Sequence, residues 1–304
     1  MVLEQAPTAH LLGAFSALGS AFFWALAAIL FRRVGDHVPA AGLNYSKGII
    51  AFICLGALLL VTETTVVDSQ SLLYLAVSGL IGICLGDSLY FVTLVRLGPR
   101  LTLLLGSLIP VVAGLVAVFG LQEHINPLSA TGLGMTIIGV AYVLWEKAPH
   151  VDRQAQSLRW LSGVMLGLLF VCSEAAGIIF TKIGVQEMPS LQATFIRQTI
   201  AIMGLTFWGL ASSALVGWVQ PLQERRIRRR VIVAAIVGAF LGTWLSVLAL
   251  KSTYTSVAAA LNSTSPLFVL PLAAYIMREK ISRRAILGTA MSVLGIAVYF
   301  FTLP

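Results

Sequence analysis

Apolar residues form ten runs along the chain, separated by short polar or charged segments. Each run is about 20 residues long, which at about 1.5 Å per helical residue matches the roughly 30 Å of hydrocarbon in a bilayer. We therefore predict ten membrane-spanning helices, at residues 11–31, 41–62, 72–95, 101–121, 127–145, 160–181, 190–218, 231–250, 255–277 and 285–302. The seventh run is long enough for a helix that tilts or bends. The alternation of apolar and polar residues that indicates a membrane barrel strand is absent.

The second half of the chain repeats the first. Shifted by 156 residues without a gap, segment 82–141 overlies segment 238–297, and the shared residues are Gly82/Gly238, Gly86/Gly242, Ser107/Ser263, Pro110/Pro266, Glu123/Glu279, Gly132/Gly288 and Gly139/Gly295. Because each half holds five predicted spans, an odd number, the second half has to cross the membrane upside down. Inverted repeats are typical of alternating-access transporters, whose substrate sites lie near the bilayer midplane. We predict an all-α integral membrane protein of two inverted five-helix repeats, residues 1–148 and 149–304.

Pairs of glycines lie at equivalent places in the third and eighth predicted spans. They form the patterns Gly82-x-x-x-Gly86 and Gly238-x-x-x-Gly242. Small residues at this spacing let two helix backbones approach closely in a membrane. We expect these two faces to pack against each other inside the protein. A face that joins two copies of the chain is the alternative.

Proline interrupts the fourth and ninth predicted spans, at Pro110 and Pro266. A proline within a helix frees the carbonyl four residues earlier, here that of Gly106 or Asn262, and in a membrane that group needs a polar partner. A simple kink is one interpretation, and the wall of a polar cavity is the other. We predict that polar and aromatic residues line such a substrate cavity. Besides Asp87, they are Trp24, Tyr90, Ser107, Trp244, Asn262, Ser263 and Ser265.

Four ionisable residues fall inside predicted spans: Lys47, Asp87, Glu174 and Arg197. Charges at such depth are costly, so they are candidates for function. Distances along the helices place Lys47 at the level of Asp87 and Glu174 at the level of Arg197. One interpretation is that two buried ion pairs fix the helices. In the other, Asp87 or Glu174 binds a substrate ammonium or carries a proton, and a base holds a substrate carboxylate.

The distribution of charge predicts the orientation in the membrane. The chain is 58% hydrophobic and 11% charged, with a net charge of +8. Most cations follow odd-numbered spans, including the run from Arg225 to Arg230, whereas connections after even-numbered spans are poor in them. By the positive-inside rule, the odd connections are cytoplasmic and both termini lie on the other side. We interpret the arginine run as a determinant of topology in contact with anionic headgroups, not as a nucleic-acid surface. Short loops favour a bacterial inner membrane.

Catalytic and metal-binding patterns are absent from the sequence. The three cysteines fall within predicted spans, and the four histidines fall near their ends. No metalloprotease, nucleophile-elbow or phosphate-loop motif occurs. We predict a protein that is not an enzyme and that has no cofactor and no metal.

The chain resembles the drug/metabolite transporter superfamily, in its ten-span EamA-type branch, over nearly its whole length. The most specific motifs are Leu105-Gly106-Ser107-x-x-Pro110 and Leu261-Asn262-Ser263-x-x-Pro266, each followed by a glutamate, together with Gly86-Asp87-x-x-Tyr90, Tyr45-Ser46-Lys47 and Phe195-Ile196-Arg197. Lys47 departs from the arginine that is usual in the family. The resemblance implies a metabolite carrier with a central cavity bounded by spans 1, 3, 4, 6, 8 and 9.

These observations predict a secondary transporter that works by alternating access. We expect it to export small polar metabolites such as amino acids, and proton coupling is a further hypothesis. The expected partners are a small-molecule substrate, the lipid bilayer and protons, without nucleic acid, and the chain acts as a monomer or homodimer. Two alternatives are open: efflux of drug-like cations or of nucleotide- or sugar-type metabolites, and a lipid-handling membrane protein without solute flux.

Overall fold

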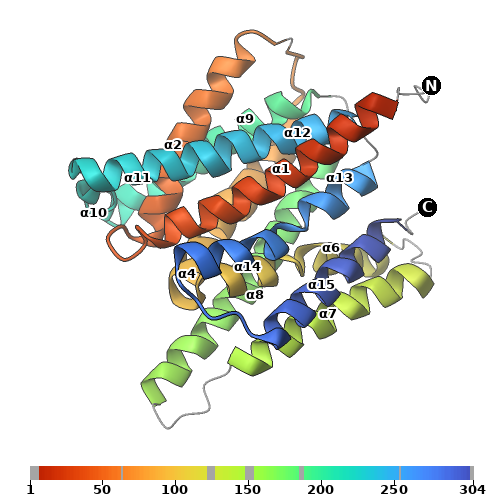
Figure 1. The fold of residues 1–304 in the computed structure, drawn as a ribbon. Coiled ribbons are helices and arrows are strands. Elements are labelled where there is room, and N and C mark those ends of the chain that lie inside the picture. Colours follow the sequence, from red (N-terminus) through yellow and green to blue (C-terminus); the bar gives the residue numbers. More distant parts are fainter. Residues whose placement is uncertain are drawn as a thin grey trace. The chain divides into compact units, whose positions relative to one another are not determined.

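The computed structural model describes residues 7–62, 64–121, 127–147, 154–184, 188–252 and 255–301, and these residues form helices without strands (Figure 1). The first half of the chain contains α1 (Pro7–Arg32), α2 (Ala40–Leu59), α3 (Ser69–Ser78), η1 (Gly79–Gly86), α4 (Asp87–Leu97), α5 (Pro99–Gly106), α6 (Ile109–Leu121) and α7 (Pro127–Lys147). The second half contains α8 (Gln154–Gly184), α9 (Ser190–Ala211), α10 (Leu215–Val219), η2 (Gln220–Gln223), α11 (Arg225–Ala235), η3 (Ile236–Gly242), α12 (Thr243–Ser252), α13 (Thr255–Asn262), α14 (Ser265–Ile276) and α15 (Arg283–Phe301).

Eight of the described helices are long and apolar enough to cross a membrane, and a ninth is obtained when one bent pair is counted as a single span. The all-helical membrane fold is therefore confirmed. The fourth predicted span is represented by a shorter apolar helix, Pro99–Ala113. The seventh ends earlier than predicted, because the chain turns by 119° between Leu191–Ala211 and Leu215–Gln223. Ser213 makes this turn with a φ of 54°, so apolar content alone overestimated the length of the span.

The ends of the helices follow from local sequence. Gly98 ends α4 with a φ of 83°, a left-handed conformation that glycine adopts without the steric cost of a Cβ. Pro99 then begins α5, at a position where the missing N–H has no helical partner to lose. Asp68 precedes α3, and its side chain accepts hydrogen bonds from the amides of Gln70 and Ser71.

The third span of each half contains a π-helical segment. The first, η1, ends at Gly86, and the second, η3, ends at Gly242, the repeat equivalent of Gly86. A π-helical segment carries one extra residue per turn and is found mostly as a short bulge, often at a functional site. The wider turn leaves backbone carbonyls that need partners outside the helix.

The fourth and ninth spans are also broken at equivalent places. In the fourth, Ser107 and Leu108 separate α5 from α6, and in the ninth, Ser263 and Thr264 separate α13 from α14. Each break lies just before the proline at the start of the following helix, as expected when a ring excludes an N–H donor and displaces the preceding turn.

The described chain divides into two compact units that do not coincide with the sequence halves. Unit 1 comprises Met1–Ile29, Pro99–Val151 and Leu241–Pro304, and unit 2 comprises Leu30–Gly98 and Asp152–Phe240. Each unit therefore takes helices from both halves. The division of the repeat into residues 1–148 and 149–304 stays a prediction about the sequence.

The main contact of unit 1 is an antiparallel crossing of α7 and α15, which lie side by side in Figure 1. A Cβ added to Gly132 would lie 2.6 Å from the carbonyl oxygen of Gly295, and one added to Gly139 would lie 2.5 Å from that of Gly288. Because the later residue of α7 meets the earlier residue of α15, the two helices run in opposite directions. They are the fifth spans of the two repeats, so their antiparallel packing is what an inverted repeat requires.

The same relation holds in unit 2, where α2 packs against α9. A Cβ at Gly48 would approach Gln198, one at Gly56 would approach Phe195, and Phe52 stacks on Phe195 with ring centroids 5.0 Å apart. These helices are the second spans of the two repeats and again run antiparallel.

The glycine pairs of the third and eighth spans do not pack as predicted. Gly82 lies against Gly177 of α8, where an added Cβ would be 3.3 Å from the Cα of Gly177, and Gly86 also faces α8. Gly242 instead lies against Trp24 of α1. For Gly82, Gly86 and Gly242 the predicted partner is therefore wrong: α8 covers the first two, and α1 covers the third. The pattern of small residues indicates close packing, but it does not say which helix approaches.

Candidate substrate-binding site

An ion pair lies within the membrane-spanning part of unit 2. Lys47 on α2 and Asp87, the first residue of α4, form it with an Nζ–Oδ2 distance of 2.5 Å. The side chains are 16% and 21% exposed, so the pair is partly exposed and not sealed in the core. The Lys47 ammonium also lies 5.8 Å from the centre of the Phe91 ring, a cation–π distance.

Polar side chains from neighbouring helices satisfy the carbonyls that η1 leaves free, just before Asp87. The Nδ2 of Asn44, a fully buried residue of α2, donates to the carbonyl of Ile83 at 2.8 Å and to Ser88 Oγ at 3.1 Å. The Oγ of Ser173 on α8 donates to the carbonyl of Ile81 at 2.9 Å. These bonds replace the ones that an α-helix would make with itself, and they fix the segment that positions Asp87.

Glu174 and Arg197 both face η1 but form no ion pair with each other in the described part of the chain. A Cβ at Gly86 would lie 3.0 Å from Glu174 Oε1, and one at Gly82 would lie 3.5 Å from Arg197 Nη2. The Nε of Arg197 is buried without a hydrogen-bond partner. The sequence placed each of these acids at the same depth in the membrane as one base. In the structure Lys47 and Asp87 form an ion pair, and Glu174 and Arg197 do not.

Tyr90 lies one helical turn after Asp87, on α4. Its ring meets that of Phe91 edge-on, with centroids 5.2 Å apart, and that of Phe170 on α8 at 5.4 Å. The aromatic group fixes the first turn of α4 against α8. Lys47, Asp87, Tyr90, Glu174 and Arg197 are thus all in unit 2 and surround η1 and the start of α4.

The other predicted cavity residues lie in unit 1. The ring of Trp24 lies against Gly242, since an added Cβ there would be 2.7 Å from its Cδ1 and Nε1 atoms. The Ser20 hydroxyl of the same helix donates to the carbonyl of Gly242 at 2.8 Å. Trp244, two residues further on, is 48% exposed. The end of η3 is thereby held by α1, as the end of η1 is held by α8.

Asn262, at the break in the ninth span, contacts the preceding helix α12. Its Nδ2 donates to Ser246 Oγ at 2.8 Å, while its Oδ1 is buried without a partner. The Ser263 hydroxyl donates to a carbonyl of its own helix, at 2.9 Å. Ser265 begins α14, ahead of Pro266.

Ser107 has a packing role in this structure. It is 5% exposed, and its Oγ lies 2.7 Å from that of Ser292 on α15 and 2.6 Å from the carbonyl of Leu104. The hydroxyl therefore covers the break between α5 and α6 from the side of α15. The repeat equivalence of Ser107 and Ser263 does not extend to the same contacts.

The glutamate that ends the ninth span also has a structural contact. Glu279 lies 3.4 Å from the guanidinium of Arg100, which is 6% exposed at the start of α5. The pair ties α14 to α5 at one end of both helices. Its repeat equivalent, Glu123, lies outside the described residues.

Comparison with known proteins decides the family. The model of the EamA-like transporter family matches residues 11–145 and 161–301, nearly the whole chain in two segments. The chain belongs to the EamA-like transporter family. This EamA-like protein is also 25% identical, over 92% of its own chain and 94% of the relative, to a protein of Archaeoglobus fulgidus named as an uncharacterized transporter. The chain also shares its fold with a protein whose crystal structure is solved. The TM-score is 0.61 and the sequences are 18% identical, and the match covers 96% of each chain.

The EamA-like protein is therefore a multi-pass membrane transporter of the drug/metabolite type, not an enzyme, with a small-molecule substrate and the bilayer as its surroundings. Sequence reasoning found its ionisable residues but missed Asn44, Ser173 and Ser246, whose contacts depend on π-helical turns and helix partners. Asn44 carried the one signal that was available, because a primary amide in an apolar run needs hydrogen-bond partners in the membrane.

Proposed function

We propose that this transporter exports small polar metabolites, with amino acids and related zwitterions as the preferred class, by alternating access. The observation that carries the proposal is the Lys47–Asp87 ion pair. It combines both signs of charge within the membrane-spanning part of the protein, next to a π-helical turn, and it is partly exposed.

The chemistry of the pair selects the class of substrate. Charges at this depth are held in place only when each has a partner. A zwitterion brings an ammonium for Asp87 and a carboxylate for Lys47, so neither residue loses its partner when the pair opens. A cation without a carboxylate would leave Lys47 unpaired, and an uncharged sugar would have to compete with the ion pair. Tyr90, one turn away, offers an aromatic surface for the rest of the molecule.

Proton coupling is the finer part of the proposal, and a second carboxylate supports it. Glu174 lies against Gly86, the residue that precedes Asp87, and makes no ion pair with Arg197 in the described part of the chain. Asp87 and Glu174 lie with Lys47 and Arg197 around η1, and within this group a proton can be exchanged as the Lys47–Asp87 pair opens and closes. Asp87 and Glu174 are both candidates for the coupling residue.

The test is flux in proteoliposomes, measured with a panel of radiolabelled amino acids, with and without an imposed pH gradient. Removing one charged hydrogen-bond partner costs about 1.5–3 kcal/mol, so Asp87→Asn and Lys47→Met are each expected to weaken transport by roughly tenfold to a hundredfold. The matched control is Asp36→Asn, which removes an exposed ion pair with Arg32. This control should transport like the wild type.

A charge exchange distinguishes binding from a structural role. In the double variant Lys47→Asp with Asp87→Lys, attraction between the helices is retained but the polarity of the pair is reversed. Recovery of the melting temperature without recovery of flux supports substrate binding by the pair. Recovery of both contradicts it and leaves the pair with a structural role.

The remaining outcomes identify the alternatives. Flux of a lipophilic cation or of a nucleotide sugar, without amino-acid flux, replaces the proposed substrate class. Lipid movement without solute flux replaces the transporter mechanism itself. Equal flux with and without the gradient, in the wild type and in Asp87→Asn and Glu174→Gln, removes proton coupling and leaves the substrate class intact.

A further inference from the structure

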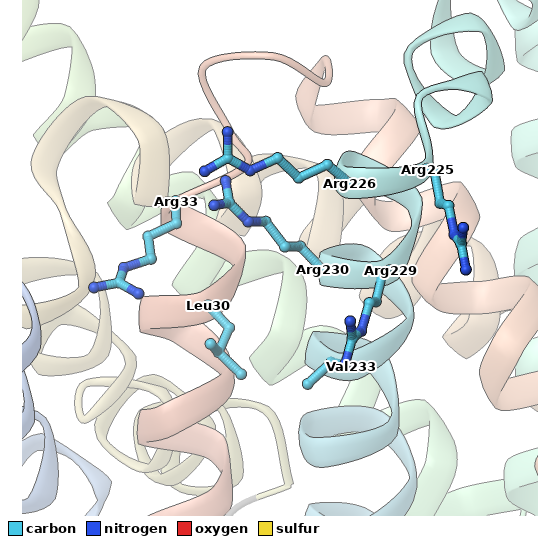
Figure 2. Close-up of a pocket in the computed structure, with 7 residues that line it drawn as sticks. All are labelled: Leu30, Arg33, Arg225, Arg226, Arg229, Arg230 and Val233. Carbon is cyan, nitrogen blue, oxygen red and sulfur yellow. The ribbon is translucent and has the colours of Figure 1, made fainter.

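A basic cavity of about 700 Å³ lies in unit 2, between the end of α1 and the start of α11 (Figure 2). Five arginines and two apolar residues line it: Leu30, Arg33, Arg225, Arg226, Arg229, Arg230 and Val233. No acidic residue is among them. A surface hollow of this size and charge is a binding site for an anion, because each guanidinium offers several N–H donors to phosphate or carboxylate oxygens.

Four of the five arginines of α11 lie on one face of the helix together with Val233, and Arg228 lies outside that face. At about 100° per residue, positions 225, 226, 229, 230 and 233 fall within less than half of the helix circumference. The opposite side carries Ile227 and Val231, which are 7% and 1% exposed and belong to the face that packs against α2. Because α11 is anchored by that buried face, its arginines are held toward the cavity. In Figure 2, Arg226 and Arg230 extend from α11 toward the end of α1 that carries Arg33.

The apolar residues of the cavity belong to the membrane-spanning parts of the same two helices. Leu30 lies in the last turn of the span Leu11–Arg32, and Val233 lies early in the span Arg225–Ala249. Figure 2 shows both on the side of the cavity that continues into the helices, with Arg226 and Arg230 at the other side. The cavity is thus basic where the spans end and apolar where they enter the membrane.

We propose that this cavity binds the phosphate headgroup of an anionic phospholipid, with the arginines around the phosphate and an acyl chain along Leu30 and Val233. A free phosphate would use the arginines alone and would gain nothing from the apolar wall. The ends of these two helices also lie on the side that the distribution of charge predicts to be cytoplasmic, where the leaflet carries anionic lipid. The site is separate from the Lys47–Asp87 pair, whose residues do not line it.

The experiment measures the melting temperature of the purified full-length protein in non-ionic detergent against increasing concentrations of short-chain phosphatidylglycerol. Short-chain phosphatidylcholine and glycerol 3-phosphate are the two comparison probes. A ligand that binds only the folded protein raises its melting temperature with a saturable dependence on concentration. We expect saturable stabilisation by phosphatidylglycerol, weaker stabilisation by phosphatidylcholine and little effect of glycerol 3-phosphate.

Two double variants with the same loss of charge test the position of the site. Each arginine near an anionic lipid contributes about a fivefold change in affinity, so Arg226→Gln with Arg230→Gln should raise the apparent dissociation constant by roughly tenfold or more. The control is Arg228→Gln with Arg283→Gln, which removes two exposed arginines outside the cavity. It should change the constant by less than about twofold, since only screened, long-range attraction is lost.

A third variant keeps every charge and fills the cavity. Val233 is 44% exposed, so Val233→Trp should leave the fold intact while it blocks the apolar wall and weakens lipid binding. Equal weakening in the two double variants would overturn the proposal, because general surface charge would then explain it. Unchanged binding by Val233→Trp, or stabilisation by glycerol 3-phosphate at the concentrations that suffice for the lipid, would also overturn it in favour of a soluble phosphate site.

Discussion

The crossing of α7 and α15 gives the most direct test of the inverted architecture, through the substitution Gly139→Ala. The added Cβ would lie 2.5 Å from the carbonyl oxygen of Gly288 and 2.7 Å from the amide nitrogen of Ser292. Both atoms belong to the backbone of α15, so no side chain can move aside. Ordinary van der Waals contact begins at 3.4 Å, which means that the helices have to separate by roughly 0.9 Å.

The cost follows from that separation. A gap of about 0.5–1 Å removes a quarter to a half of the dispersion attraction between facing atoms, and overpacking of this kind typically costs about 1–3 kcal/mol. We expect Gly139→Ala to lie in the upper part of that range. The matched control is Gly134→Ala on the same helix, where an added Cβ meets nothing within 4 Å. Alanine should be neutral there or stabilising by up to about 1 kcal/mol, because it favours the helix.

The assay is unfolding of the purified protein by a rising fraction of SDS in mixed micelles, followed by circular dichroism. A second measurement uses Gly132→Ala and Gly295→Ala, whose added atoms would occupy the same gap from opposite helices. Once one substitution has moved the helices apart, the other should cost less, so the double variant should lose less stability than the two single losses added together. If Gly139→Ala is as stable as Gly134→Ala, or if the two costs simply add, the close backbone crossing does not exist.

Two further predictions concern the ends of helices. Glu279→Gln should lower the free energy of unfolding by about 1–2 kcal/mol, measured in the same assay, because it leaves the buried Arg100 guanidinium without its carboxylate, and Lys280→Gln next to it should have little effect. Asp68→Asn should remove a pH dependence. Hydrogen bonds from Ser71, together with the amide of Gln70, hold the pKa of Asp68 below its ordinary value, so the charged cap stabilises α3 at neutral pH and is lost as the carboxyl protonates in acid. Between neutral and acidic pH, the melting temperature of the wild type should fall by more than that of the variant, and equal falls would show that the cap has no such role.

Several parts of this fold were accessible from the sequence because they depend on short-range patterns. The length of an apolar run predicts a span, and the odd number of spans in a repeat predicts inversion. The antiparallel crossings of α7 with α15 and of α2 with α9 agree with that prediction. The seventh span failed because its apolar character continues through the turn at Ser213, where neither glycine nor proline marks the change of direction.

The candidate site was accessible only in part, since depth along a helix is one coordinate and the direction around the helix is another. Lys47 and Asp87 share both, and they form an ion pair. Glu174 and Arg197 contact glycines four residues apart along η1, Gly86 and Gly82, so the equal level estimated from the sequence is not found. No pattern in the sequence indicated the π-helical turns that set these contacts. A π-helical turn is stabilised by donors from other helices, here Asn44, so it cannot be inferred from the segment that adopts it.

The contacts between repeat-equivalent helices limit how this transporter can move. An inverted repeat suggests a movement in which the two halves of the chain rock against each other. However, α7 and α15 come from different halves and meet backbone to backbone within unit 1. Within unit 2, α2 and α9 also come from different halves, and the side chains of Gln198, Ile202 and Phe195 pack against the glycines of α2. A rigid rotation of one half against the other would have to break both crossings, and that of α7 with α15 cannot adapt because backbone meets backbone there. A movement that preserves them keeps each pair of helices together, so we expect any moving body of the transporter to contain helices from both repeats and not from one repeat alone.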